Sequence, residues 1–341
     1  MRRSIKMELL FVVMFLFCFA GTAFAARPLK MYAAYPEDSI LTIGYFKAAD
    51  EIREKTEGRV NIKVFPGAQL GSYEDVIEEI RQGTIEFGAT WLTKRYDERL
   101  DILNLPGYGA LGYARLEKIC YSKDSPLPTY VADVLRSMNV VSLGAWPEPY
   151  ATYAFIKGKR PANLTDFENK KTNIRVPHMP LYRDAAITMG YQTVTIDYSE
   201  VFNSMQTGQV DGTTGITLEV LYLVAKDIVK HIDYNRFHGN PCWLLANQEM
   251  RESFSEEDRK IVADTFEKWS RDTLAQLDKL DNDYKKKLEE AGIEVYVHSD
   301  ENYIAQARHM RKEIWPKYYG IFGEQFLKDF DAYVTSMEDD R

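Results

Sequence analysis

The chain has 341 residues, and its 43 lysines and arginines against 51 aspartates and glutamates give a formal net charge of −8 at pH 7. Because the chain is acidic and has no run of basic residues, we do not expect nucleic acids or anionic membrane surfaces as main partners. The length exceeds what one hydrophobic core usually serves, so we expect two domains.

Residues 1–25 have the pattern of a secretory signal peptide. Basic residues at positions 2, 3 and 6 precede an almost unbroken apolar run over residues 9–20, and Ala23 and Ala25 fit a signal-peptidase site. The apolar run is short for a membrane span. We therefore expect cleavage after Ala25 and a soluble, exported product.

Strand and helix patterns alternate along the rest of the chain, which is typical of an α/β fold. The pattern predicts strands over residues 29–35 and 60–65 around a helix that Gly58 ends, extended segments over 140–146 and 150–158, and a helix over 181–190.

A long charged helical pattern begins at Ser255, a residue that can cap a helix, and runs to about Glu290. Its apolar stripe fits packing against the rest of the chain better than the seam of a coiled-coil dimer. We therefore expect a monomer rather than a dimer.

One short unit occurs twice. Residues 75–88 can be laid over residues 200–213 without a gap, with matching apolar, glycine and acidic positions. In each copy a serine, Ser72 or Ser199, precedes a helical pattern that a glycine ends, and a β-like segment follows. This predicts one helix-turn-strand unit in each of two similar lobes. The loops after these strands, residues 89–92 and 213–216, would then lie at equivalent positions.

Arg175 lies in a short β-branched segment. Ile174 and Val176 suit one face of a strand, which places Arg175 on the other, and Pro177 ends the strand because it has no N–H to donate. Open α/β sheets bind ligands beside the carboxyl ends of their strands. On these residues alone, however, a solvent-facing ion pair is the commoner role for such an arginine.

Signatures of catalysis are missing. The sequence contains no HExxH, CxxC, GxSxG, GxGxxG or GxxxxGK[ST] motif, so we expect no enzyme activity, no cofactor and no metal site. His231 and His238 lack the nearby ligands that would make a convincing metal site. An exported protein permits a disulfide between Cys120 and Cys242, but buried apolar fillers are the favoured interpretation.

Taken together, three segments resemble the substrate-binding proteins of tripartite ATP-independent periplasmic (TRAP) transporters, of the dicarboxylate-binding (DctP) type. They are residues 64–88, 173–180 and 198–212, and residues 242–262 add a fourth. The resemblance implies a two-lobed α/β binding protein of the periplasm, with mixed sheets flanked by helices and a long C-terminal helix bridging the lobes. Its implied boundaries are residues 26–150 with about 238–280 for the first lobe, and 151–237 with about 281–341 for the second.

Proteins of this family bind an organic acid between their lobes and deliver it to a membrane permease driven by an ion gradient. The resemblance places Arg175 at the arginine that pairs with the acidic group, and a guanidinium suits a carboxylate or a sulfonate. The resemblance implies further contacts for Ala34, Tyr35, Tyr73 and Trp91 from the first lobe, and for Tyr153, His178, Tyr198 and Gly215 from the second. Because Gly215 has no side chain, we expect the hydroxyl groups of Thr213 and Thr214 to donate in its place.

Tyr153 lies near the position where many relatives carry a second arginine. One fixed cation among aromatic walls favours a small monoanion in a tight pocket over a long sugar acid or a dianion. For Tyr73 and Tyr153, core packing is an equally good interpretation. A binding protein of an ATP-driven importer and a periplasmic sensor component are the alternative functions, and the ligand itself stays open.

Overall fold

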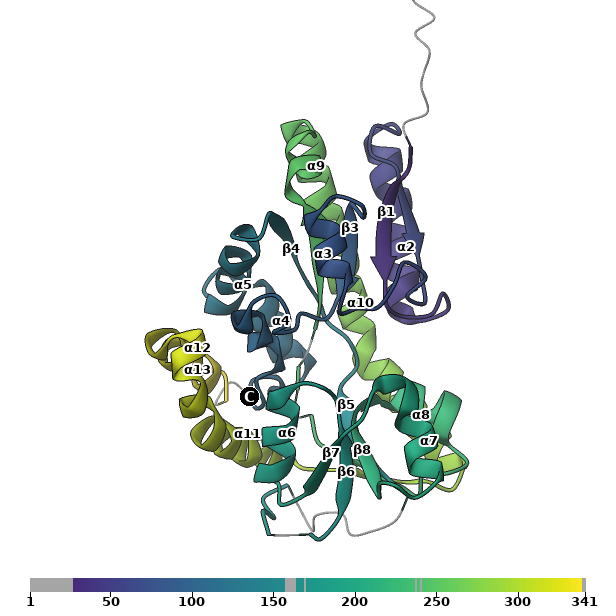
Figure 1. Ribbon diagram of the computed structural model, residues 1–341, viewed down its shortest axis with the longest axis vertical. Coiled ribbons are helices and arrows are strands. Elements are labelled where there is room, and N and C mark those ends of the chain that lie inside the picture. The colour runs from purple at the N-terminus through teal and green to yellow at the C-terminus, as the bar shows by residue number, and fades with distance from the viewer. Residues whose placement is uncertain (1–26, 157–163, 169, 237, 240, 339–341) are drawn as a thin grey trace, which may run out of the picture.

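The computed structural model describes residues 27–156, 164–168, 170–236, 238, 239 and 241–338, so the expected signal peptide lies outside the described residues. The strands form two mixed sheets, each flanked by helices (Figure 1). The first sheet has the strand order β2-β1-β3-β10-β4, and the second has the order β11-β9-β5-β8-β6-β7.

The first sheet and its helices come from two separate parts of the chain. Its strands are β1 (Leu29–Ala33), β2 (Ile62–Phe65), β3 (Phe87–Thr90), β4 (Val140–Trp146) and β10 (Cys242–Asn247). Its helices are α2 (Ile40–Lys55), α3 (Val76–Arg81), α4 (Tyr113–Tyr121), α5 (Pro126–Arg136) and α9 (Gln248–Glu252), with the 3-10 turns η1 (Glu98–Asn104) and η2 (Gly109–Leu111).

The second sheet is formed mainly by the intervening segment. Its strands are β5 (Ala151–Phe155), β6 (Asn173–Val176), β7 (Gln192–Thr195), β8 (Gly212–Thr217), β9 (His231–Tyr234) and β11 (Glu294–Val297). Its helices are α6 (Pro180–Thr188), α7 (Val201–Gln206) and α8 (Leu218–Ala225), with the turn η3 (Tyr198–Glu200).

Five strands of the second sheet repeat the plan of the first. The order β2-β1-β3-β10-β4 corresponds to β7-β6-β8-β5-β9. The relative directions agree as well, because the first three strands are parallel and the fourth is antiparallel to its two neighbours in both sheets. Strand β11 is an addition to the second sheet, parallel to β9.

The repeated sequence unit forms α3–β3 in the first sheet and α7–β8 in the second, as predicted. Gly83 and Gly208 end the two helices at φ angles of 74° and 75°, which glycine adopts without a steric penalty. The predicted serine caps are wrong. The Ser72 hydroxyl donates to the Asp75 carboxylate instead, and Ser199 lies inside η3, so both helices begin later than expected.

An acid in each unit ties its strand to the neighbouring strand. Glu86 Oε2 accepts a hydrogen bond of 2.7 Å from the backbone N–H of Lys30, at the start of β1. Asp211 Oδ2 accepts one of 2.9 Å from the N–H of Asn173, at the start of β6. The two bonds occupy equivalent places in the two sheets, so Lys30 of β1 corresponds to Asn173 of β6. Two residues further along each strand, Tyr32 corresponds to Arg175.

The long helix α10 (Glu256–Glu290) has 35 residues, about 52 Å at the usual rise of 1.5 Å per residue. The Ser255 hydroxyl accepts from the N–H of Asp258 and caps its start, as predicted. The helix packs against α2 and β4 of the first lobe and against α8 and β11 of the second (Figure 1). Packing of its apolar stripe within the chain is therefore confirmed.

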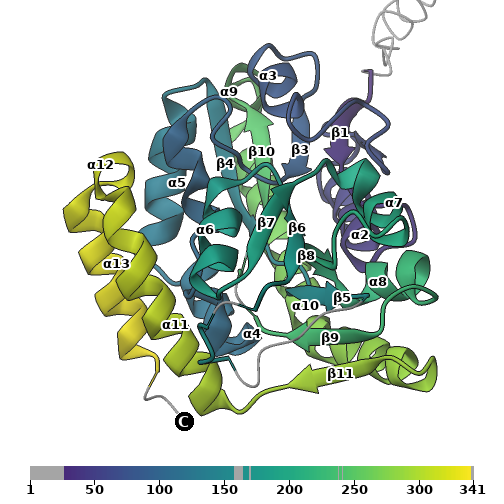
Figure 2. The same ribbon diagram turned by 60° about the horizontal axis from the view of Figure 1, so that its bottom comes forward.

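The C-terminal helices α11 (Asp300–Ile314), α12 (Tyr319–Phe322) and α13 (Glu324–Ser336) line one side of the molecule (Figure 2). Helix α11 contacts α6 of the second lobe, whereas α13 contacts α5 of the first. The end of the chain thus joins the two lobes a second time.

Cys120 and Cys242 are both buried and unpaired, so no disulfide joins them. Cys120 lies in the hydrophobic core, as the filler interpretation predicts, whereas the thiol of Cys242 donates to the Glu148 carboxylate. His231 and His238 stack on Phe155 and Tyr182. In the described part of the chain, no group of three or more His, Cys, Asp or Glu side chains is arranged to hold a metal ion. None of the described helices has the length and apolar character that a bilayer span requires.

The two carboxylate ties are testable by substitution. Glu86→Ala and Asp211→Ala each leave a strand N–H without its acceptor, so each is expected to lower the free energy of unfolding by about 1–3 kcal/mol in urea denaturation. Glu54→Ala, which removes an exposed carboxylate from α2, is the control and is expected to change it by less than about 0.5 kcal/mol. Losses from Glu86→Ala and Asp211→Ala no larger than that of the control would contradict the assignment.

Candidate binding site

Arg175 is a buried cation on β6. Arg175 is only 2% exposed, so it is not a solvent-facing ion-pair partner. Its Nε donates to the carbonyl of Ile196 at 2.8 Å and its Nη1 to the carbonyl of Thr214 at 3.3 Å. Among the described residues no carboxylate forms an ion pair with it. Burial lowers the pKa of Arg175 from its ordinary value to about 10, which still leaves it protonated at neutral pH.

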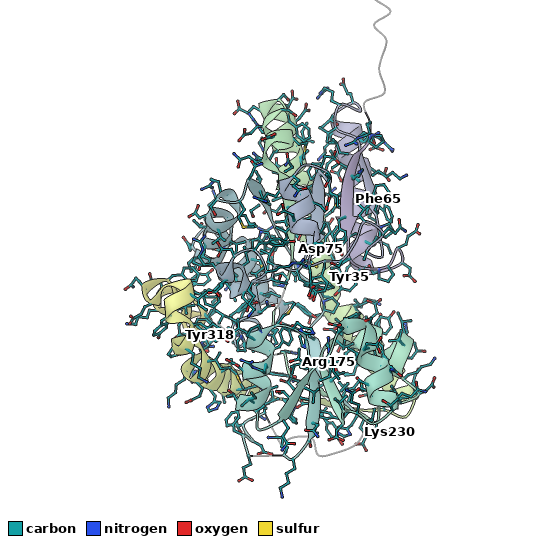
Figure 3. All side chains as sticks on the ribbon, viewed as in Figure 1. Tyr35, Phe65, Asp75, Arg175, Lys230 and Tyr318 are labelled. Carbon is teal, nitrogen blue, oxygen red and sulfur yellow. The ribbon has the colours of Figure 1, made fainter. Side chains whose placement is uncertain are left out.

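Two tyrosines from different lobes lie near this cation. Tyr198 follows β7 and is half exposed, and Tyr73 precedes α3 in the first lobe. The guanidinium acts electrostatically on the hydroxyl groups of both. Figure 3 shows Arg175 on the side of the second lobe that faces the first, with Tyr35 on the facing edge of the first lobe. Arg175 is also the last residue but one of β6, which confirms its predicted position near the end of a strand.

Three aromatic side chains of the first lobe form what we call the aromatic wall: Tyr35, Tyr73 and Trp91. The ring centres of Tyr35 and Trp91 are 5.5 Å apart, and those of Tyr73 and Trp91 are 5.3 Å apart. The interplanar angles of 64° and 88° make both contacts edge-to-face, the arrangement that aromatic quadrupoles favour. We refer to the aromatic wall with Arg175 and Tyr198 as the interlobe site.

Glu148 lies behind the aromatic wall and was missed in the sequence. It belongs to the connection between β4 and β5, where the chain passes from the first sheet to the second. Its carboxylate accepts hydrogen bonds from Tyr35 Oη at 2.5 Å, from Trp91 Nε1 at 2.9 and 3.1 Å, and from Cys242 Sγ at 3.8 Å. Burial raises the pKa of Glu148 from 4.5 to about 7. An acid between two prolines in the apolar stretch WPEPY was the available signal.

Tyr32 was also missed. It is fully buried on β1, at the position equivalent to Arg175, and its hydroxyl has no hydrogen-bond partner within the described residues. Tyr73 and Cys242 act electrostatically on this hydroxyl. The equivalent strand positions of the two lobes therefore hold a cation on one side and a neutral phenol on the other.

The remaining predicted residues lie in less direct positions. His178 is exposed, and its Nε2 lies 2.9 Å from the carboxylate of Asp197. Tyr153 is buried, with its ring stacked on that of Tyr191 at 5.4 Å between centres, which is the position of a core residue. Ala34 is partly buried in the turn after β1, next to Tyr35.

Residues 213–216 lie within β8 rather than in the predicted loop, because they continue to pair with β5. They contribute backbone rather than side chains. Thr214 is buried, and its carbonyl oxygen accepts from Arg175 and from the Thr213 hydroxyl at 3.2 Å. Gly215 has a φ of 86°, where a side chain would strain the backbone. This part of β8 therefore holds the guanidinium in place.

A separate hollow of about 250 Å³ lies between α2, α8 and α10. Its lining includes Asp38, Lys47, Glu219 and Trp269. Arg175 does not line it, so it is distinct from the interlobe site.

Glu148 gives the stability of the protein a pH dependence of defined sign. Its folded pKa of about 7 lies above the usual 4.5, so the folded state binds the proton more tightly and loses this stabilisation as the pH rises through about 7. Glu148→Gln cannot ionise, so it should be more stable than wild type by about 1–3 kcal/mol near pH 8.5. Urea denaturation at about pH 5 and about pH 8.5 measures this. A difference between variant and wild type that is the same at both pH values would argue against the assignment.

The comparisons with known proteins agree with this architecture. The sialic acid-binding periplasmic protein SiaP of Vibrio cholerae is 24% identical over 259 residues, 73% of this chain and 76% of SiaP. A TRAP periplasmic solute-binding protein from Desulfovibrio salexigens with bound orotic acid superposes with a TM-score of 0.78, at 18% identity over 91% of this chain and 99% of the other. One from Chromohalobacter salexigens with bound D-glucuronate gives 0.74, at 21% identity over 92% and 100%.

The fold of these two structures is the two-lobed fold described above. The family model described as "Bacterial extracellular solute-binding protein, family 7", DctP, matches residues 32–320. The chain therefore belongs to the DctP family of TRAP solute-binding proteins.

Proposed function

We propose that this protein captures a small organic anion between its lobes and delivers it to the membrane permease of a TRAP transporter, which imports it with an ion gradient. Family membership makes it a solute-binding protein for small organic acids. The observation that carries the rest of the proposal is Arg175, a buried cation without a carboxylate partner among the described residues.

The physics of Arg175 suits an anion anchor. Burying a charge is costly unless an opposite charge compensates for it, and two backbone carbonyls compensate only in part. These carbonyls accept hydrogen bonds from the Nε–H and from one Nη1–H. The remaining N–H donors of the guanidinium are therefore left for a ligand. A carboxylate or sulfonate placed there receives charge-assisted hydrogen bonds.

Closure of the lobes follows from the division of contacts. Arg175 and Tyr198 belong to the second lobe, whereas the aromatic wall belongs to the first. A ligand that contacts both sets interacts better with the closed form than with the open form, and this difference in affinity drives closure. With Arg175 as the fixed cation of the interlobe site, the ligand carries a single anionic group.

Relatives support the acid class. The names of similar proteins give orotic acid, D-glucuronate and sialic acid as their ligands. These three molecules share an acidic group and differ in the rest of their structure. Arg175 therefore explains the shared part, and the aromatic wall is expected to set the individual specificity.

Substitution of Arg175 tests the anchor. Native mass spectrometry of freshly purified protein, followed by a thermal-shift screen with orotate, D-glucuronate and pyroglutamate, provides a bound acid as the probe. Arg175→Ala is expected to weaken its binding by about 30-fold to several thousand-fold in calorimetry, because the anion loses its charged partner. Arg175→Lys is expected to recover part of the loss.

Arg183→Ala is the matched control, because Arg183 is an exposed arginine of the same lobe that pairs with Asp184. Its affinity should equal that of wild type. Binding by Arg175→Ala within a few-fold of wild type would rule out Arg175 as the anchor.

Uptake by cells separates the transport mechanisms. Deletion of the gene is expected to abolish uptake of the acid identified above, and an ionophore should stop uptake in the undeleted strain even while cellular ATP is maintained. Uptake that follows ATP and ignores the ionophore would instead indicate an ATP-driven importer. Unchanged uptake after deletion would indicate a sensor component.

A further inference from the structure

Glu148 is a second buried charge at the interlobe site. The residue is 8% exposed, and within the described part of the chain its carboxylate has no cationic partner. Of its two oxygens, Oε2 receives Tyr35, Trp91 and Cys242, whereas Oε1 receives Trp91 alone. Because a carboxylate oxygen has two lone pairs, Oε1 keeps one acceptor position.

The aromatic wall in front of this carboxylate has the character of a cation site. Aromatic faces carry negative electrostatic potential, and a cation within about 6 Å of a ring centre is attracted to it. The rings of Tyr35 and Trp91 donate their O–H and N–H groups to Glu148, and this bond to an anion increases the electron density of both rings. The rings meet at 64° and 88°, so they form edge-to-face contacts rather than a flat stack.

Both buried charges act on the same small region. The charges of Arg175 and Glu148 both influence the hydroxyl group of Tyr198. Arg175 also acts on Tyr73, which contacts Trp91 of the aromatic wall. A single small ligand therefore meets a positive charge on the second lobe and a negative charge behind the wall of the first.

We propose that the ligand of the interlobe site is a small zwitterion, with its carboxylate at Arg175 and an ammonium group at the aromatic wall, backed by Glu148. This inference rests on the proposed function and specifies the class of acid. The zwitterion compensates for both buried charges at once, whereas an acid without a cationic group leaves Glu148 uncompensated. A dicarboxylate would place a second anion beside Glu148 and is excluded by repulsion.

A purely structural role for Glu148 is the competing interpretation. In that case the carboxylate only holds Tyr35 and Trp91 in position, and the charge of the ligand near the wall is immaterial. The two interpretations differ in one measurable quantity, the preference of the site for a charged over a neutral group of the same shape.

Two pairs of probes isolate that quantity. Glycine betaine and 3,3-dimethylbutanoate have the same shape and carboxylate, but only the first has a quaternary ammonium. L-Proline and cyclopentanecarboxylate share a five-membered ring and a carboxylate, but only proline has a charged nitrogen. Calorimetry near pH 8 is expected to show binding of at least one zwitterion, with an affinity at least about tenfold above that of its partner without the ammonium group.

Glu148→Gln assigns the preference to the carboxylate. It should reduce the preference for the zwitterion to about threefold or less, while circular dichroism and thermal melting confirm that the variant folds. Asp281→Asn is the matched control, because Asp281 is a buried carboxylate on α10 that also accepts two hydrogen bonds, from Tyr113 and Tyr234. Its preference should equal that of wild type.

A pH series gives an independent readout. Glu148 has a pKa of about 7, so affinity for the zwitterion should rise about tenfold between pH 6 and pH 8, and Glu148→Gln should abolish the rise. The groups facing Glu148 all have raised pKa values and keep their protons over this range. They are Tyr35, Tyr45, Tyr108, Tyr198 and Cys242.

The outcomes separate this inference from the proposed function. Equal or tighter binding of the member that lacks the ammonium group, in each pair, would overturn the inference, as would binding of neither zwitterion at up to about 10 mM. A preference for the zwitterion that survives Glu148→Gln would also overturn it. Arg175-dependent binding of orotate or D-glucuronate alone would leave the proposed function standing, whereas an anion that binds independently of Arg175 would remove both.

Discussion

The burial of one guanidinium organises the interlobe site. Arg175 lies on β6 between β7 and β8, and the carbonyls that hold it come from Ile196, directly after β7, and from Thr214, within β8. A fixed cation in a low-dielectric setting attracts an anion far more strongly than an exposed one. The order of strands in the second sheet therefore creates the electrostatic character of the site.

The two lobes share a plan but divide the chemistry. Strands β1 and β6 are equivalent, and each is tied at its start by an acid, Glu86 or Asp211. Two residues after the tied N–H, the strand of the second lobe carries the buried Arg175 and the strand of the first lobe carries the buried Tyr32. The anion-binding cation thus belongs to one lobe and the aromatic surface to the other, so a ligand needs both lobes to satisfy its polar and apolar parts.

Local patterns predicted much of the fold. Alternation and glycine positions identified the repeated units, because Gly83 and Gly208 are required by the local backbone alone. The serine caps failed because a hydroxyl can bond to a nearby side chain as well as to a helix N–H, and Ser72 does so with Asp75. The sequence could not show which face of a strand is buried against helices, so the core position of Tyr153 was undecided between two interpretations.

The family resemblance, rather than the residue pattern, singled out Arg175. Neither the resemblance nor the residue pattern could identify Glu148, because its partners Tyr35 and Trp91 are 113 and 57 residues away in the sequence. Contacts over such distances exist only after the sheets have assembled. The structure alone brings these three side chains together.

The interleaving of the two sheets affects how the chain reaches its native state. Strand β10 lies between β3 and β4 in the first sheet, yet it follows five strands of the second sheet in the sequence. A nascent polypeptide therefore exposes the pairing edges of β3 and β4 until residue 247 is available, and the first lobe cannot mature as an independent amino-terminal unit. Secretion in an unfolded form suits such a chain, since all strands then become available in one compartment before either sheet closes.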